Sequence, residues 1–115
     1  MVATDSQMSG AFPRLLGQMV RDNRLMELRE AVRRSTSLPA TVFNIPQRGI
    51  IRENYFADLV VFDAATIADQ STLDKPNQYP AGIDYVLVNG VVTLTPRGLT
   101  GARPGYALLR NQSRR

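Results

Sequence analysis

Carboxylates are the main side chains in this 115-residue sequence with acid, base or metal-ligand chemistry, because the chain contains no His and no Cys. That composition excludes disulfides, zinc fingers, Cys nucleophiles and Ser-His-Asp triads built from this chain alone. Four aspartates follow one another at short intervals, namely Asp58, Asp63, Asp69 and Asp74. Their spacing does not match an EF-hand loop, so we expect them at turns and strand ends rather than around a cation.

Three other clusters of functional side chains lack the neighbours that a site needs. They are Gly98, Gly101 and Gly105; Ser35, Thr36 and Ser37; and Tyr79, Tyr85 and Tyr106. No helix start follows the glycines, so we expect turns rather than a phosphate cradle. The hydroxyls have no base beside them and suit the end of a helix, and the tyrosines suit strand packing. Residue types and spacing alone therefore define no complete active site.

The first third of the sequence predicts helices. Apolar residues recur at helical spacing over 12–22, and Pro13 suits the first turn of that helix. Gly17 lies inside it and destabilises the helix by about 1 kcal/mol relative to Ala. A second helix is predicted over 27–36, where Glu30 and Arg34 form a favourable i,i+4 pair. A short turn follows Pro39, and Asn44 is expected to close it in the left-handed conformation.

The rest of the sequence predicts strands. Residues 50–51 and 106–109 suggest short strands, and 57–63 a strand covered on both faces, because four apolar residues run together. Residues 83–88 and 91–94 flank Asn89-Gly90, a strong hairpin signal. The loop over 64–82 is long enough that we expect it to be functional or to pack on another element. The fold class is therefore α+β, with a helical part over 1–44 and a β-rich part over 45–115.

Charge and hydropathy exclude several partners. The net charge is +4 and the isoelectric point is near 10.1, but the arginines are interspersed with acids and no aromatic–basic pattern accompanies them. We therefore expect no nucleic-acid partner. No apolar run is long enough to cross a membrane, and no signal peptide is readable. The absence of Cys fits a reducing compartment, so a cytoplasmic location is expected.

A series of motifs in order resembles the carboxyl-terminal portion of the D-aminoacylases, the N-acyl-D-amino-acid deacylases of the amidohydrolase superfamily. The motifs are Thr4-Asp5-Ser6, FPRLLGQMVRD (12–22), LREAVRRSTSLPA (28–40), RGII (48–51), ADLVVFD (57–63), YPAGIDYVLVNG (79–90) and LTGARPGYALLR (99–110). The pieces ADLVVFD and VNG recur across amidohydrolases, whereas the stretch from 80 to 90 and the Thr-Gly-Ala-Arg-Pro-Gly ending are more specific to the deacylases. Each motif alone is weak, but seven in the right order are a specific signal.

The resemblance implies a metal-dependent hydrolase whose catalytic domain is a zinc-centred (β/α)₈ barrel with a small composite β domain. Residues 1–44 would then hold the end of the last barrel strand and the helices after it, and 45–115 the carboxyl-terminal share of the β domain. A whole barrel needs about 250 residues, so this chain cannot contain one. The metal ligands lie upstream in the family, and no zinc is expected on this chain alone.

Asp5 is the one catalytic residue that the resemblance implies. In the family an Asp at the end of the eighth strand takes a proton from the attacking water and passes it to the leaving amine, and Asp5 matches that position. Without the resemblance, Asp5 is a loop aspartate of the kind that forms turns or caps. The family pattern usually has Ser-Asp-Gly at 4–6 and a longer loop with a His before residue 12, and both features differ here.

Two hypotheses follow. In the first, the chain is part of an N-acyl-D-amino-acid deacylase that hydrolyses a C–N amide bond to a D-amino acid and a carboxylate, and it needs a complementary upstream polypeptide for activity. In the second, the chain is a non-catalytic remnant that acts as an oligomeric or interaction module. Its β part would lack the strands that the family supplies from the amino-terminal region, and unpaired sheet edges favour self-association, so a homo-oligomer is predicted.

Overall fold

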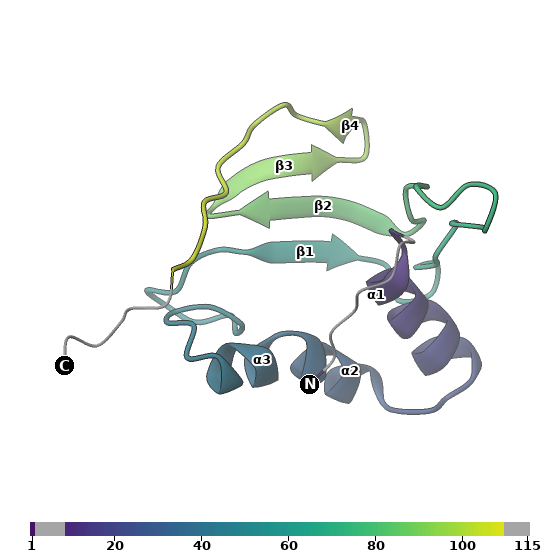
Figure 1. The fold of residues 1–115 in the computed structure, drawn as a ribbon, viewed down its shortest axis with the longest axis horizontal. Coiled ribbons are helices and arrows are strands. Elements are labelled where there is room, and N and C mark those ends of the chain that lie inside the picture. Colours follow the sequence, from purple (N-terminus) through teal and green to yellow (C-terminus); the bar gives the residue numbers. More distant parts are fainter. Residues whose placement is uncertain (2–8, 110–115) are drawn as a thin grey trace.

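The structure is a computed structural model that describes Met1 and residues 9–109. A helical part and an antiparallel sheet lie side by side, joined by long connections (Figure 1). The helices are α1 (Ala11–Arg14), η1 (Leu15–Asp22), α2 (Leu28–Ser35) and α3 (Ser37–Val42), and the strands are β1 (Leu59–Phe62), β2 (Ile83–Val88), β3 (Val91–Thr95) and β4 (Gly98–Leu99). This arrangement confirms the helical and β-rich halves of the α+β prediction.

The first helical segment begins at Ala11, one residue before the predicted start, and changes from an α-helix to a π-helix after Arg14. Pro13 lies in α1, where the first turn needs no N–H from it. The chain then widens into the π-helix η1, and the N–H of Asn23 donates to the carbonyl of Gln18, five residues earlier. Asp22 is the last helical residue, as the sequence predicted.

The helix α2 carries ion pairs between its own residues on its exposed face. Glu27 precedes α2 and makes no side-chain cap hydrogen bond, so the first turn of α2 has no side-chain cap. The carboxylate of Glu30 accepts from Arg33 at 2.8 Å and from Arg34 at 2.6 Å, and these hydrogen bonds lower the pKa of Glu30 to about 2. After α3, Asn44 has a φ of 52°, which confirms the predicted left-handed turn.

The sheet has the order β1-β2-β3-β4, with antiparallel pairing throughout. Val88 pairs with Val91 across the predicted Asn89-Gly90 turn, whose φ angles of 49° and 79° suit a hairpin of primed type. The register between β1 and β2 shifts at Phe62, where the strand ends. After β4 the chain runs back across one end of the sheet (Figure 1).

Three strand predictions need correction. Residues 50–51 and 106–109 form no strand, because their backbones have no neighbouring strand to pair with among the described residues. The prediction that the 57–63 strand is covered on both faces is also wrong for this chain, since Val60 and Val61 point to opposite faces and are 53 % and 49 % exposed. An apolar run of this kind is typical of a strand covered on both faces, and no helix among the described residues supplies that cover.

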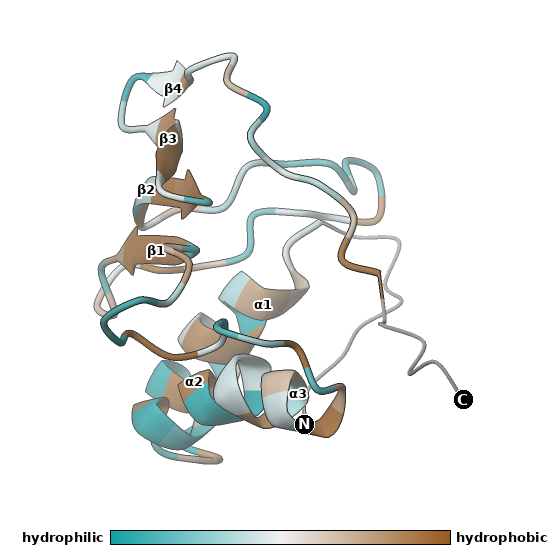
Figure 2. Ribbon diagram, turned by 90° about the vertical axis from the view of Figure 1, so that its left-hand side faces the viewer, coloured by the Kyte–Doolittle hydropathy of each residue, from teal (hydrophilic) through white to brown (hydrophobic). Residues whose placement is uncertain are grey.

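The core of the described residues is small and lies in the helical part and the loop beside it. The buried apolar residues are Leu15, Ala31 and Ile67. No helix in the described part of the chain packs against a strand, so neither face of the sheet carries a helical layer. In Figure 2 the sheet is seen edge-on, with β1 and β3 mostly hydrophobic and β2 partly so, and the helices lie to one side of it. No helix in the described part of the chain has both the length and the apolar character needed to cross a bilayer.

The chain exposes more surface than a self-contained domain of its mass. Its accessible surface is 9046 Å², whereas a compact protein of 12.8 kDa exposes about 6,300 Å². Its radius of gyration is 15.3 Å, against about 13.4 Å for a compact domain of this length. Within the part of the chain that the structure describes, no second layer packs on the sheet, although sheets in stable domains bury a face against one.

Candidate functional site

Asp5, the predicted catalytic residue, lies outside the described residues. The first described residue after it is Ser9, which is hydrogen-bonded to the long loop that precedes β2. The N–H of Ser9 donates to the carbonyl of Pro76 at 3.1 Å. Its hydroxyl lies 3.2 Å from the same carbonyl and 3.0 Å from that of Gln78, so it can donate to either. Ser9, three residues after the Thr4-Asp5-Ser6 motif, is thus bound to a segment far away in the sequence.

An ion pair holds the same loop to the start of the first helix. Arg14 donates from Nε and Nη2 to Oδ2 of Asp69, at 2.9 and 2.5 Å. The other carboxylate oxygen of Asp69 accepts from the backbone N–H of Ser71 at 2.8 Å and from its hydroxyl. Only 6 % of the Asp69 side chain is exposed. Burial would raise the pKa of Asp69, but the hydrogen bonds from Ser71 and Arg14 outweigh it and hold the pKa below its usual value.

A glycine makes this approach possible. A Cβ added at Gly10 would lie 1.7 Å from Oδ1 of Asp69, which no side chain could tolerate without displacing the carboxylate. The backbone before α1 therefore lies directly against Asp69. We call the group formed by Ser9, Gly10, Arg14, Asp69 and Ser71 the loop anchor.

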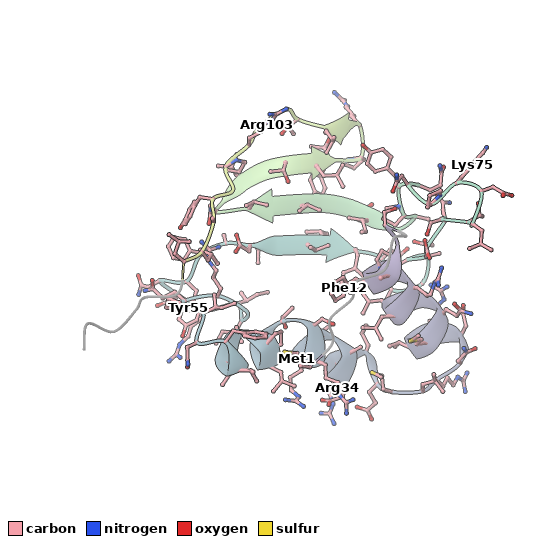
Figure 3. The ribbon with its side chains drawn as sticks, in the orientation of Figure 1. Met1, Phe12, Arg34, Tyr55, Lys75 and Arg103 are labelled. Atoms are coloured by element: carbon pink, nitrogen blue, oxygen red, sulfur yellow. The ribbon has the colours of Figure 1, made fainter. Side chains whose placement is uncertain are left out.

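The remainder of the loop packs on η1 through a single buried residue. Ile67 is 1 % exposed, and Arg21 donates to its carbonyl at 2.7 Å. A Cβ on Gly17 would lie 2.3 Å from that same carbonyl oxygen, and one on Gly82 would lie 2.5 Å from the Ile67 nitrogen. The prediction that the 64–82 loop packs on another element is confirmed. Lys75 lies in the outer part of this loop, on the opposite side of the molecule from Tyr55 (Figure 3).

A second polar cluster ties three segments together at the other end of the sheet. The guanidinium of Arg48 donates to Asp58, to Oδ1 of Asn89 at 2.6 Å and to the hydroxyl of Tyr106 at 3.1 Å. It also lies 4.2 Å from the centre of the Phe56 ring, a cation–π geometry. Only 10 % of the Arg48 side chain is exposed. This cluster fixes the segment after β4 to the hairpin turn and does not form an open site.

The aspartates that follow one another in the sequence are separated in space by their structural roles. Asp58 pairs with Arg48, and Asp69 pairs with Arg14. Asp63 accepts from the N–H of Ala65 at 2.8 Å. Among the residues that the structure describes, no three His, Cys, Asp or Glu side chains gather as a metal site would require. With no His or Cys in the sequence, these residues do not fit a zinc centre by themselves.

The tyrosines and hydroxyl residues take structural positions. Tyr85 lies in β2, Tyr79 in the loop and Tyr106 beside Arg48, so the expectation of strand packing holds only for Tyr85. Ser35 donates to the carbonyl of Ala31 at 2.9 Å, at the end of α2 as expected. Sequence reasoning missed the loop anchor, because Arg14 and Asp69 are 55 residues apart and no motif links them.

Comparison with known proteins gives a consistent answer. Residues 3–94 match the amidohydrolase family. The chain is 44 % identical over 104 residues to an N-acyl-D-glutamate deacylase of Alcaligenes xylosoxydans xylosoxydans, a match that covers 90 % of this chain and 21 % of the relative. It is 45 % identical over 101 residues to a D-aminoacylase of the same organism, covering 88 % and 21 %.

Solved structures agree with these relatives. A D-aminoacylase crystal structure superposes with a TM-score of 0.78 at 44 % identity, covering 81 % of this chain and 20 % of the other. The N-acyl-D-glutamate deacylase of Bordetella bronchiseptica, solved with zinc and a phosphonate inhibitor, superposes with a TM-score of 0.77 at 47 % identity, covering 84 % and 20 %. The chain thus spans about a fifth of the length of the relatives it matches. A family match over most of its residues shows that this chain belongs to the amidohydrolase family.

Proposed function

We propose that this chain is the carboxyl-terminal share of a metal-dependent N-acyl-D-amino-acid deacylase and is not competent alone. The observation that carries the proposal is the 44 % identity over 90 % of the chain to an N-acyl-D-glutamate deacylase. Its substrate would be an N-acyl-D-amino acid, and its products a carboxylate and a free D-amino acid.

The proposed contribution of this chain to the reaction is one proton-transfer group. Hydrolysis adds water across the C–N amide bond, so the attacking water loses a proton and the leaving nitrogen gains one. A carboxylate within hydrogen-bond reach of both can carry that proton. Asp5 is the candidate. The zinc that the family uses would polarise the amide and the water, and its ligands would come from a complementary upstream polypeptide.

The uncovered sheet supports the need for such a partner. Among the described residues no helix packs against a strand, and Val60 and Val61 on β1 are 53 % and 49 % exposed. The edge strands β1 and β4 also leave one side of their backbones unpaired among the described strands. A polypeptide that covers the sheet would complete both the fold and the site.

The alternative proposal is a non-catalytic module that assembles with copies of itself. The same exposed residues favour it, in particular Val60 and Val61 on opposite faces of β1. An exposed apolar strand at a sheet edge promotes pairing with another chain. Light scattering separates this proposal from a stand-alone domain: a stable monomer that unfolds cooperatively would count against a homo-oligomer.

A deacylase assay tests the first proposal. The chain is incubated with N-acetyl-D-amino acids and Zn²⁺, first alone and then with a polypeptide that carries the upstream barrel of a deacylase. We expect no turnover by the chain alone and turnover by the mixture. A mixture that associates but never hydrolyses the substrate would refute the catalytic proposal and favour the interaction module.

A further inference from the structure

The helix η1 is wound more widely than an α-helix, and both of its ends are held by one short stretch of the loop between β1 and β2. At its beginning, Arg14 donates from two nitrogens to the carboxylate of Asp69. Near its end, Arg21 donates to the carbonyl of Ile67 at 2.7 Å. Two loop residues only two positions apart therefore bind arginines that are seven positions apart along the helix.

The π winding reduces the mismatch between these two spacings. Seven residues of α-helix rise about 10.5 Å. With about 4.4 residues per turn at a similar pitch, seven residues of π-helix rise about 8.6 Å. The backbones of Ile67 and Asp69 can be separated by at most about 7 Å, even in a fully extended loop. The wider winding thus brings Arg14 and Arg21 closer to the spacing of their loop partners.

Two glycines allow Ile67 to lie between the helix and the entry to the sheet. A Cβ on Gly17 would lie 2.3 Å from the Ile67 oxygen, and one on Gly82, directly before β2, would lie 2.5 Å from the Ile67 nitrogen. No helix contacts a strand among the described residues, so this stretch of loop is what places η1 relative to β2.

Away from Ile67, the boundary between η1 and the loop is polar and open. A cavity of about 320 Å³ lies there, lined by Arg14, Gln18, Arg21 and Ser71 among others. Both arginines are partly exposed, so the loop is held by a few polar contacts beside one buried apolar side chain. Segments held in this way open locally at a lower free energy than the whole fold.

We infer that η1 and the loop form a two-state winding device, in which the docked loop selects the π-helix and undocking lets η1 rewind as an α-helix. A π-helix is rare, so its winding persists where surrounding contacts favour it over the α form. Over the eight residues of η1, rewinding lengthens the helix by about 2 Å. Because η1 contacts α2, the device passes the position of the loop on to the next helix.

Scalar couplings across hydrogen bonds, measured by NMR on the isotope-labelled full chain, report the winding directly. The amide of Asn23 couples to the carbonyl of Gln18 in the π form and to that of Met19 in the α form. Asp69→Ala removes one contact from the loop side and leaves the sequence of η1 intact. Loss of these charge-assisted hydrogen bonds should lower the docking equilibrium constant at least about tenfold. The Asn23 coupling should then move from Gln18 to Met19.

Asp58→Ala is the matched control, because it also removes an ion-paired aspartate, but at the other end of the sheet. It should leave the coupling to Gln18 unchanged. Docking of the loop is followed separately by the nuclear Overhauser effect between Gly17 and Ile67, whose backbones are in contact. This signal should disappear in Asp69→Ala together with the π coupling and persist in Asp58→Ala.

Loss of the Gly17–Ile67 signal with the π coupling retained would overturn the device, as would an α-helical coupling in the wild type. If the loop stays docked in Asp69→Ala, the double variant Asp69→Ala/Arg21→Met removes both contacts, and a loop that still stays docked refutes their role. If Asp69→Ala does not fold, Asp69→Asn, which keeps the side-chain volume, should shift the coupling in the same direction by a smaller amount, and an unchanged coupling with the loop undocked would refute the device.

Discussion

Gly17 is the position where the structure reverses a simple expectation from the sequence. By helix propensity alone, Gly17→Ala should stabilise the helix by about 1 kcal/mol. In the structure, however, a Cβ at residue 17 would lie 2.3 Å from the carbonyl oxygen of Ile67, which is backbone and cannot rotate away. Gly17 therefore permits the loop to lie directly on η1.

The magnitude follows from the two effects that the methyl group would have. Overpacking at a close contact costs about 1–3 kcal/mol. Displacing the Ile67 carbonyl also weakens its 2.7 Å hydrogen bond from Arg21, which contributes about 1 kcal/mol at this partly exposed side chain. These losses exceed the gain in propensity, so we expect a net loss of about 2 kcal/mol in the free energy of unfolding.

Urea unfolding followed by circular dichroism measures this difference. A loss of about 2 kcal/mol lowers the urea midpoint by about 1 M for a chain of this size. Gly105→Ala is the matched control, because a Cβ there would meet only Val88 at an ordinary 3.8 Å. A Gly17→Ala variant that is more stable than the wild type would refute the packing of the loop on η1.

Two further predictions concern the polar clusters. Arg48→Ala should lower the free energy of unfolding by about 3 kcal/mol, because it removes charge-assisted hydrogen bonds and a cation–π contact with Phe56, and Arg48→Lys should recover less than half of that. Urea midpoints check both, and a Lys variant equal to the wild type would contradict the cluster's geometry. The lowered pKa of Asp69 stabilises the fold above its unfolded pKa of about 3.9, and this stability is lost as the pH falls through the lower folded pKa. The urea midpoint, measured from pH 6 to pH 2, should therefore decrease once the pH drops below about 4. The decrease should be less steep in Asp69→Asn. Midpoint-versus-pH curves that run parallel for the two proteins would count against the ion pair.

Local signals in the sequence predicted the local elements well. The Asn89-Gly90 hairpin, the left-handed Asn44 and the helix ending at Asp22 all depend on residues within a few positions of one another. The strand at residues 59–62 was likewise evident from its apolar run. Its surroundings were not, because the layer that would bury Val60 and Val61 is absent from the described residues.

The polar clusters could not be predicted because they join residues distant in the sequence. Arg48 and Tyr106 are 58 residues apart, and no pattern in either segment indicates the other. The same is true of Arg14 and Asp69. Asp5 was found only by its resemblance to the deacylases, and its geometry stays a prediction because the residue lies outside the described part of the chain.

In the proposed function, this chain supplies a proton carrier and receives its zinc site from another polypeptide. Zinc bound per chain, measured by equilibrium dialysis together with turnover of an N-acetyl-D-amino acid, tests that claim directly. We predict that the isolated chain retains no stoichiometric zinc and shows no turnover, and that activity in the mixture with the upstream polypeptide is lost in Asp5→Asn. One tightly held zinc on the isolated chain, with hydrolysis that survives Asp5→Asn, would contradict it.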